Sequence, residues 1–320
     1  MAWGIVDKGV GASDLQSIMF SEYLGVLLDG ISGTTCVVSG CAITGGANMT
    51  PTVAKGAVLS TGVLLAVASA TVTIGAADGT NPRIDLIVIT SAGAKAVRAG
   101  TAAANPKPPA RTAGDVVIGA VYVPAGATTI PTTYITDMRV IRSRVTLKAT
   151  TTPVTFNTTL GIQTYFTVTL PSGLFLAGQQ LRVRCGGTML LNSGTPTVTL
   201  TIAYGGTTMV ADVSSAATAD TDRLAWFLDF DMNASANAAQ QIGGVLAMSP
   251  VGAKTAPTTG LGIDLLTPAA LANVHIVSPL SGTAAVDSDA GDRTLTVQWT
   301  MSVSNAADEI SMLYGTCELL

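Results

Sequence analysis

Alternating runs of β-branched residues, separated by glycine and proline, dominate the chain from about residue 30 to its end. Successive side chains of a strand point to opposite faces, so a period of two indicates strands with one buried face. The runs are short, and turn residues separate them at spacings typical of all-β domains. Clear examples are VTLKATTTPVTF (145–156), TVTLTIAYGG (197–206), LAWFLDFDM (224–232) and TLTVQWTMSV (294–303). The sequence therefore predicts a mainly β fold.

A change in proline content near residues 140–150 predicts two domains. The proline-rich segments ANPKPPAR (104–111) and PAGATTIP (124–131) precede this point, and long alternating strands follow it. We expect a β-rich N-terminal domain over residues 1–144 and a jelly-roll-like β-sandwich over residues 145–320, because about eight strands suit a two-sheet arrangement. The similar segments RCGGTMLL and AYGGTTMV, about twenty residues apart, predict that each Gly-Gly pair ends a strand at an equivalent corner of the sandwich.

Two segments could depart from this pattern. SDLQSIMFSEYLGVLLDG (13–30) is the one candidate helix, with Ser13 as its cap and an apolar face. GAVLSTGVLLAVASATVTIGAA (56–77) is uncharged, but glycine and serine interrupt it and it lacks the anchors of a membrane span. Two strands joined by a turn are the better interpretation, so we expect no membrane insertion. The N-terminus has no basic region before an apolar core, so no signal peptide is expected.

Charge is scarce throughout the chain. Charged residues make up 11% of the 320 residues and apolar residues 48%, whereas charged residues make up about 25% of an average soluble protein. A surface with so little charge is typical of chains covered by copies of themselves or by other proteins, and we expect a homotrimer. Residues 145–320 contain six Lys and Arg against twelve Asp and Glu. This acidic balance, without a basic cluster, excludes a nucleic-acid surface.

Residues that could carry chemistry are few. His275 is the single histidine and has no neighbour at ligand spacing, so neither a metal site nor a catalytic triad is indicated. Asp229 and Asp231 share one face of a predicted strand, as paired catalytic carboxylates of a depolymerising enzyme would, but nothing accompanies them. The acidic segment with Asp287, Asp289 and Asp292 lacks the spacing of a calcium loop, and an acidic turn is favoured over a cation site. We expect no enzymatic activity, no catalytic residue, no cofactor and no metal.

The cysteines and aromatic residues are expected to be structural. Four scattered cysteines do not form a disulfide scaffold, and free thiols in a reducing cytosol are the simpler interpretation. Aromatic residues in alternating strands are expected in the core or in a subunit interface, whereas a sugar platform would need an exposed ring beside hydrogen-bonding groups. The residues concerned are Tyr165, Phe166, Trp226, Phe227, Trp299 and Tyr314.

Residues 78–139 resemble a module of tailed-bacteriophage virion proteins. The resemblance rests on DGTNPRIDLIVI, AVRAGTAAANPKPPA, GDVVIGAVYVPAGATTI and ITDMRV, which occur in this order. The C-terminal part is similar to the jelly-roll heads of phage surface proteins through the Gly-Gly-Thr hairpin, DRLAWFLDFDM and SMLYGTCELL. The resemblance implies a structural component of a virion, assembled in the bacterial host cytoplasm, with an N-terminal domain that attaches to other virion proteins and a C-terminal domain that projects. A tail fibre, tail tip or baseplate protein is the first interpretation; a capsid decoration or head-fibre protein, and a carbohydrate- or receptor-binding module that contacts the host, are the alternatives.

Within this module, Arg83 and Asp85 place opposite charges two residues apart on an apolar strand, and Asp137 and Arg139 repeat the spacing. Residues i and i+2 of a strand share a face, so each pair lies on one side of the sheet. We expect cross-strand ion pairs, Arg83 with Asp137 and Asp85 with Arg139, that fix the register of the sheet. The alternative is two solvated pairs that contribute less than about 1 kcal/mol each. Without a nucleophile or base nearby, the role is structural.

Overall fold

The computed structural model describes residues 34–142, 144–157, 161–192, 197–213, 223–250, 276–303 and 305–320. The chain divides into two compact units, Met1–Ser143 with Pro171–Leu174, and Arg144–Leu170 with Phe175–Leu320. Within the described residues the regular structure is strand, apart from the short 3-10 turn η1 (Thr132–Tyr134). The predicted mainly β fold is therefore confirmed. The candidate helix at residues 13–30 lies outside the described residues.

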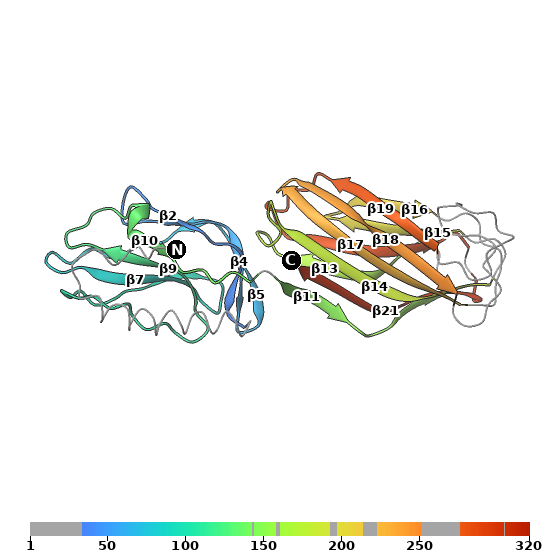
Figure 1. Ribbon diagram of the computed structural model, residues 1–320, viewed down its shortest axis with the longest axis horizontal. Helices are drawn as coiled ribbons and strands as arrows, with labels where there is room; N and C mark the ends of the chain where they lie inside the picture. The colour runs from blue at the N-terminus through green and yellow to red at the C-terminus, as the bar shows by residue number, and fades with distance from the viewer. Residues whose placement is uncertain are drawn as a thin grey trace. The chain divides into compact units, whose positions relative to one another are not determined.

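Three antiparallel sheets form the N-terminal unit (Figure 1). The largest, here called the β7 sheet, has the order β10-β9-β7-β8 and consists of β7 (Arg83–Ile89), β8 (Lys95–Arg98), β9 (Val116–Val123) and β10 (Ile135–Asp137). A second sheet joins β1 (Cys36–Gly40), β4 (Gly56–Ser60) and β5 (Val63–Val67). A small third sheet joins β2 (Ile43–Thr44), β3 (Thr52–Val53) and β6 (Ala70–Thr71).

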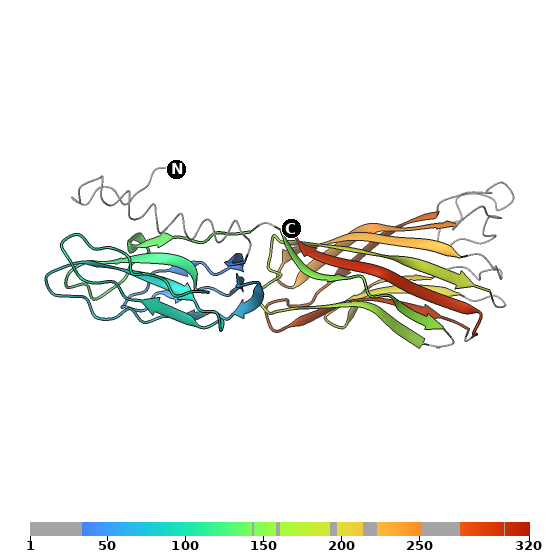
Figure 2. The ribbon, with the colours of Figure 1, turned by 90° about the horizontal axis from the view of Figure 1, so that it is seen from below.

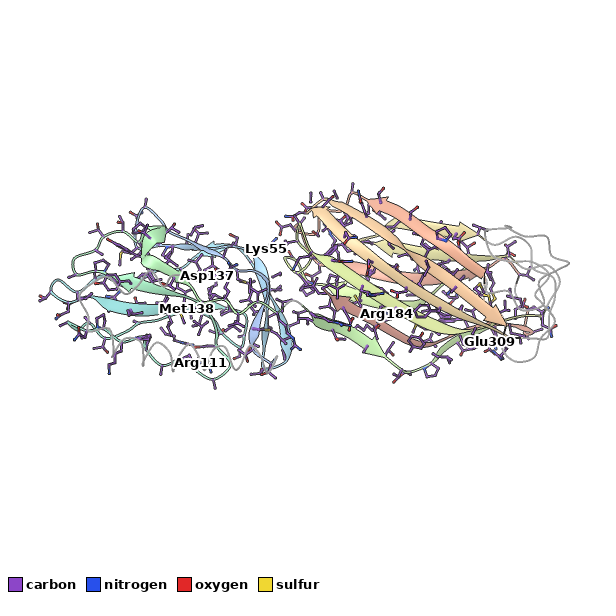
Figure 3. All side chains as sticks on the ribbon, in the orientation of Figure 1. Lys55, Arg111, Asp137, Met138, Arg184 and Glu309 are labelled. Carbon is purple, nitrogen blue, oxygen red and sulfur yellow. The ribbon has the colours of Figure 1, made fainter. Side chains whose placement is uncertain are left out.

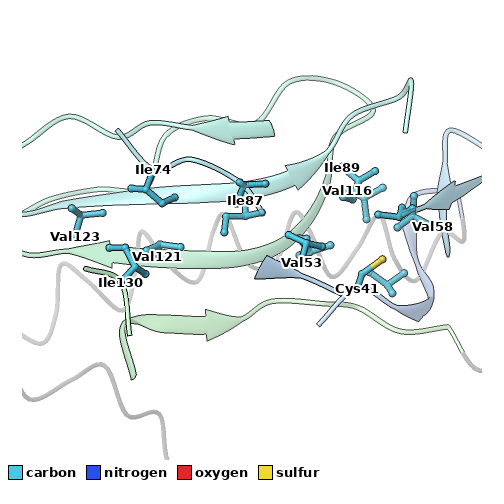
Figure 4. Packing of buried hydrophobic residues seen from close by; sticks show 14 residues of the cluster. Cys41, Val53, Val58, Ile74, Ile87, Ile89, Val116, Val121, Val123 and Ile130 are labelled. Carbon is cyan, nitrogen blue, oxygen red and sulfur yellow. The ribbon is translucent and has the colours of Figure 1, made fainter. Parts of the chain in front are cut away.

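The core of this unit forms on both faces of β7, whose seven residues are all buried. On one face, Ile87 and Ile89 belong to a cluster that includes Val58 and Val121 (Figure 4). On the other face, Ile84, Leu86 and Val88 pack with Val117, Ala120 and Met138. Burial on both faces explains why this stretch is nearly continuous in apolar residues rather than alternating.

Residues 56–77 form strands, as predicted. β4 and β5 make an antiparallel hairpin, and the turn between them uses Thr61 and Gly62, whose φ angles are 49° and 83°. Glycine takes a positive φ without strain, which suits a tight hairpin turn. Among the described residues no helix has the length and apolarity to cross a membrane.

The C-terminal unit contains two antiparallel sheets, visible as two layers in Figure 2. The first, here called the β14 sheet, has the order β11-β21-β14-β17-β18-β19, with β12 also paired to β21. Its strands are β11 (Val145–Thr150), β12 (Val154–Asn157), β14 (Gln180–Leu191), β17 (Leu224–Ala236), β18 (Ala239–Pro250), β19 (Ile276–Ala284) and β21 (Asp308–Leu319). The second, the β20 sheet, has the order β13-β20-β15-β16 and consists of β13 (Gly161–Leu170), β15 (Val198–Tyr204), β16 (Thr207–Val213) and β20 (Arg293–Met301).

The chain crosses repeatedly between these two sheets. β13, β15 and β20 lie in one sheet, whereas β14, β17 and β21 lie in the other, and the last strand, β21, pairs with the first strands, β11 and β12. Such connections are typical of Greek-key sandwiches. The order is compatible with the jelly-roll-like arrangement expected from the sequence, with β18 and β19 as additional strands; the jelly-roll assignment stays a prediction.

Aromatic side chains join the two sheets. The rings of Trp226 on β17 and Trp299 on β20 meet edge to face, with centroids 5.7 Å apart. The hydroxyl of Tyr165 on β13 donates a hydrogen bond to the carbonyl of Ile310 on β21, at 3.1 Å. Both tryptophans and Tyr165 are buried, so these contacts belong to the core between the layers.

The two Gly-Gly pairs are not equivalent, and that prediction is wrong. Gly205 and Gly206 form the two-residue turn between β15 and β16 with φ angles of 55° and 83°. Gly186 and Gly187 instead lie inside β14, between β17 and β21. A Cβ at Gly187 would collide with the backbone oxygen of Ser311, so this glycine permits close approach of two strands rather than a turn.

Candidate functional site

Arg83 and Asp85 form a buried ion pair within one strand. Nε of Arg83 lies 3.0 Å from Oδ1 and 3.1 Å from Oδ2 of Asp85. Arg83 also donates from Nη1 to the carbonyl of Ala76 at 2.6 Å and from Nη2 to the carbonyl of Gly75 at 2.5 Å. Oδ1 of Asp85 accepts the backbone N–H of Gly100 at 2.9 Å. One ion pair therefore fastens two loop segments to β7, and its donors and acceptors are used within the fold.

The predicted cross-strand pairing of these residues is wrong. β7 and β10 both pair with β9, on its opposite sides, so a whole strand separates Arg83 from Asp137. The register also sets Arg83 opposite Val123 and Asp137 opposite Gly119, four residues apart along β9. With about 4.8 Å between adjacent strands and about 3.3 Å per residue along a strand, Arg83 and Asp137 lie roughly 16 Å apart. Each charged residue instead pairs with its neighbour two positions along its own chain segment.

Asp137 and Arg139 form the second pair, near the surface. Nη2 of Arg139 lies 2.6 Å from Oδ2 of Asp137, whose side chain is 58% exposed. The hydrogen bond from Arg139 lowers the pKa of Asp137 below its ordinary value. Nη1 of Arg139 also donates to the carbonyl of Gly40 at 2.7 Å, so this pair fastens the end of the β7 sheet to the end of β1.

A third ion pair in this unit, Arg98 with Asp115, was not foreseen. Its Nε–Oδ2 and Nη2–Oδ1 distances are 2.8 and 3.0 Å, and Oδ2 also accepts the backbone N–H of Thr112 at 3.0 Å. Asp115 is 2% exposed. Arg98 lies in the segment AVRAGT and Asp115 in GDVV, two of the segments on which the phage resemblance rests. Their presence in the same module is the one feature of the sequence that links them.

Charged side chains also form ion pairs on the outward face of the β14 sheet. Arg182 binds Asp229 through two contacts, Nε–Oδ1 at 3.1 Å and Nη2–Oδ2 at 2.8 Å. Arg184 reaches the same carboxylate at 3.3 Å, and Asp231 lies 3.9 Å from Arg182 (Figure 3 labels Arg184). Burial acts to raise the pKa of Asp229, but Arg182 and Arg184 outweigh it, and the net shift is downward. Asp229 and Asp231 do share a face, as predicted, but arginines occupy that face with them.

Glu309 and the acidic turn at residues 287–292 also carry charge in the C-terminal unit. Glu309 accepts hydrogen bonds from Nη1 and Nη2 of Arg223, at 2.7 and 3.0 Å, and these lower its pKa. In the acidic turn, Oδ1 of Asp287 accepts the N–H of Asp289 at 2.9 Å, and the carbonyl of Asp287 accepts Nε of Arg293 at 2.8 Å. No group of three or more His, Cys, Asp or Glu side chains in the described part of the chain is arranged to hold a metal ion. His275 lies outside the described residues.

Tyr314 is the exposed aromatic residue of the β14 sheet. Tyr165, Phe166, Trp226 and Trp299 are buried, whereas the side chain of Tyr314 is 39% exposed. Its ring lies over Gly186: a Cβ on that glycine would come within 2.5 Å of the phenol oxygen. Burial raises the pKa of Tyr314, and Arg184 lies two positions along β14 from Gly186, on the same face of the strand. An exposed ring therefore lies beside hydrogen-bonding groups.

The four cysteines are free, as predicted, and the structure shows that all four are buried. Burial raises the pKa of Cys41 to about 11 and the pKa values of Cys185 and Cys317 to about 12. The reactive form of a cysteine is the thiolate. These three thiols are therefore protonated at neutral pH.

No protein-family model and no curated protein matches this chain. Solved structures similar to it include the CBM2 module of the evolved Dit of Lactobacillus casei BL23 phage J-1, at 9% identity over 48% of this chain and 67% of that chain, with a TM-score of 0.21. A second is infectious bursal disease virus, Gt strain, at 13% identity over 89% of this chain and 70% of that chain, with a TM-score of 0.24. A third is the insecticidal delta-endotoxin Cry8Ea1 of Bacillus thuringiensis, at 10% identity over 89% of this chain and 52% of that chain, with a TM-score of 0.24. At such low TM-scores the likeness carries no argument about activity or partners.

Proposed function

We propose that the protein is a structural, non-enzymatic component of a bacteriophage virion that projects from the particle surface, in a tail fibre, tail tip or baseplate. The observation that carries the proposal is the module at residues 78–139. The four segments that resemble phage virion proteins contain β7, β9, β10 and most of β8, and these strands form one sheet. The charged residues inside these segments, such as Arg83 and Asp115, are the residues that fasten that sheet.

The polar side chains support a structural role. Asp229 and Asp231, the two carboxylates that a depolymerising enzyme could use, lie beside Arg182 and Arg184, and these ion pairs support a structural role for that face. Arg83, Asp85 and Asp115 are buried and bound to backbone groups. Ion pairs of this kind fix the positions of loops and strands.

Labelling of intact particles tests the proposal. Virions of the phage that encodes the chain are incubated with a gold-labelled antibody raised against residues 144–320 and imaged by electron microscopy. Label on the tail supports the proposal, and unlabelled particles, together with the absence of the chain from purified virions by mass spectrometry, contradict it. Label on the head contradicts the tail location and supports the alternative, a capsid decoration or head-fibre protein.

As part of the same proposal, we expect the protein to form a homotrimer. Low surface charge supports it, because free monomeric domains usually carry more charge. In sedimentation equilibrium the chain, of 32.2 kDa, should have about three times that mass. A monomer at micromolar concentration contradicts the trimer but leaves the virion location to the labelling experiment.

A second candidate function, a carbohydrate- or receptor-binding module, is favoured by Tyr314 specifically. An exposed ring beside Arg184 and Asp229 offers both a stacking surface and hydrogen bonds to a sugar. The test is binding to polysaccharide extracted from the host cell surface, with Tyr314→Ala as the variant and Leu313→Ala, also exposed at 44%, as the control. At least a tenfold loss in Tyr314→Ala alone supports this function, and equal binding by both variants contradicts it.

A further inference from the structure

The outward face of the β20 sheet is uncharged and rich in threonine, and we call it the threonine face. Along β20, Leu295, Val297 and Trp299 are buried in the sandwich, so the residues that alternate with them point outward. These outward residues are Thr294, Thr296, Gln298 and Thr300. β13 and β15 contribute further threonines by the same alternation, including Thr164 and Thr201.

The pairing register arranges these residues in rows across the four strands. One row consists of Thr164, Gln298, Thr201 and Ala211, from β13, β20, β15 and β16 in that order. Within it, Nε2 of Gln298 donates to Oγ1 of Thr164 at 2.9 Å. Apart from Gln298, the side chains of this row are short.

The neighbouring row ends in exposed aliphatic side chains at both edges of the sheet. Its members are Ile162, Thr300, Thr199 and Val213. Ile162 is 61% exposed and Val213 is 54% exposed. Large aliphatic residues with this exposure, at the rim of an uncharged face, indicate a surface that another protein covers.

Charge is absent from the threonine face although it is present nearby. The four strands contain two charged residues, Asp212 and Arg293. Both lie at positions that alternate with the outward residues, so neither belongs to the threonine face. The carboxylate of Asp212 accepts a hydrogen bond from Ser278, and Arg293 donates one to the carbonyl of Asp287. The outward face of the β14 sheet, in contrast, carries Arg182, Arg184, Asp229 and Asp231. The two faces of one sandwich therefore differ in charge.

We infer that the threonine face is where copies of this chain contact one another, an inference that rests on the proposed homotrimer. Residues 145–320 carry twelve acidic and six basic residues, so copies repel unless the surfaces that meet are uncharged. Depletion of charge is the compositional mark of an interface core. The outward positions of these four strands hold no aromatic ring, so the face lacks the stacking surface of a sugar site.

The size of the face suits this partner. Four strands about 4.8 Å apart, with outward residues about 6.7 Å apart along each strand, cover on the order of 500 Å² of flat area. A stable interface covers about 800 Å² on each partner. The threonine face with its aliphatic edges thus supplies most of one side of such an interface.

Single charged substitutions test the inference. Thr201→Arg and Thr296→Glu place charges of opposite sign on the threonine face, and Val245→Arg places one on the exposed outward side of β18 as a matched control. We expect both threonine-face variants to associate at least tenfold more weakly than the wild type, because association would bury the introduced charge without a partner. Sedimentation equilibrium of the full chain measures association, and far-UV circular dichroism verifies that each variant is folded.

Each result separates this inference from the proposal on which it rests. Trimeric wild type and control with monomeric, folded threonine-face variants support the inference. If the two threonine-face variants stay trimeric, or the control dissociates instead, the interface lies elsewhere and the inference is wrong while the trimer stands. A monomeric wild type overturns the trimer and the inference together, independently of where the virion carries the protein.

Discussion

Arg83 and Asp85 lie two residues apart on one face of β7, and both are withdrawn from solvent, with residue exposures of 8% and 0%. Two charges are costly to bury unless their hydrogen-bonding groups are satisfied. Here two loop carbonyls and one loop N–H complete the pair. The pair therefore holds these loops against β7, whose residues are all buried. The hydrogen bonds to the loops offset the cost of burying the two charges.

Removing one charge of this pair should destabilise the N-terminal unit strongly. In Asp85→Asn the amide can still accept the N–H of Gly100, but Arg83 keeps a buried charge without its carboxylate. We expect a loss of about 3–5 kcal/mol in the free energy of unfolding. The matched control, Asp137→Asn, alters an exposed carboxylate and should cost at most about 1 kcal/mol. Urea unfolding, with hydrogen exchange at β7, measures both; equal losses in the two variants would contradict the distinction.

Stability should decrease in acid through the carboxylates whose pKa is lowered in the folded state. Asp137, Asp229 and Glu309 have native pKa values below their ordinary values of 3.8, 3.8 and 4.5. Their contribution is complete above these ordinary values and is lost as the pH falls through the lower native ones. The urea concentration at the midpoint of unfolding should therefore decrease as the pH is lowered from about 5 to about 3. Arg223→Gln, which removes the partner of Glu309, should make the decline shallower; a midpoint that rises on acidification would refute the argument.

Much of the fold could be predicted because local patterns determine it. Strands such as 294–301 alternate visibly between buried Val297 or Trp299 and outward threonine. The hairpin at Gly205-Gly206 follows from the positive φ that both positions require. Gly186-Gly187 looks the same in the sequence, yet its role depends on β21, more than a hundred residues away in the chain. A glycine needed for close approach cannot be distinguished from a turn glycine without knowing its neighbour.

The ion pairs show the same limit. The spacing of Arg83 and Asp85 places them on one face, but which strand lies next to β7 depends on the order of the sheet, and β9 intervenes before β10. Cross-strand ion pairs do occur in this protein, between Arg184 on β14 and Asp229 on β17, which lie directly opposite each other. The sequence thus indicates that cross-strand ion pairs form, but it does not specify which strands are neighbours.

The buried cysteines should be unreactive in the folded protein. At pH 8 a thiol with a pKa of about 11, such as Cys41, is thiolate in only about one molecule in a thousand. Burial adds a steric barrier. We expect little reaction of the native protein with Ellman's reagent within minutes and reaction of all four cysteines after unfolding in guanidinium. Rapid labelling of even one native cysteine would show that its surroundings open to solvent.

Alanine substitution at Gly186 and Gly187 should have unequal effects, because the two glycines have different neighbours. A Cβ at Gly187 would meet the backbone of Ser311 and Met312, whereas a Cβ at Gly186 would meet the phenol group of Tyr314. Backbone in a paired strand cannot move without disturbing the ladder, but a partly exposed side chain can rotate away. We expect Gly187→Ala to lower the free energy of unfolding by about 1–3 kcal/mol or more, and Gly186→Ala to lower it by less than about 1 kcal/mol while Tyr314 becomes more exposed.

Urea unfolding and the accessibility of Tyr314 to iodination measure the two effects separately. Gly243→Ala on β18 is the control, because a Cβ there meets nothing within 4 Å, and it should change stability by less than about 0.5 kcal/mol. If Gly186→Ala proves as destabilising as Gly187→Ala, the ring of Tyr314 is held rigidly against β14. A rigid ring beside Arg184 would strengthen the case for Tyr314 as a binding surface, because a preorganised contact loses less entropy when a ligand binds.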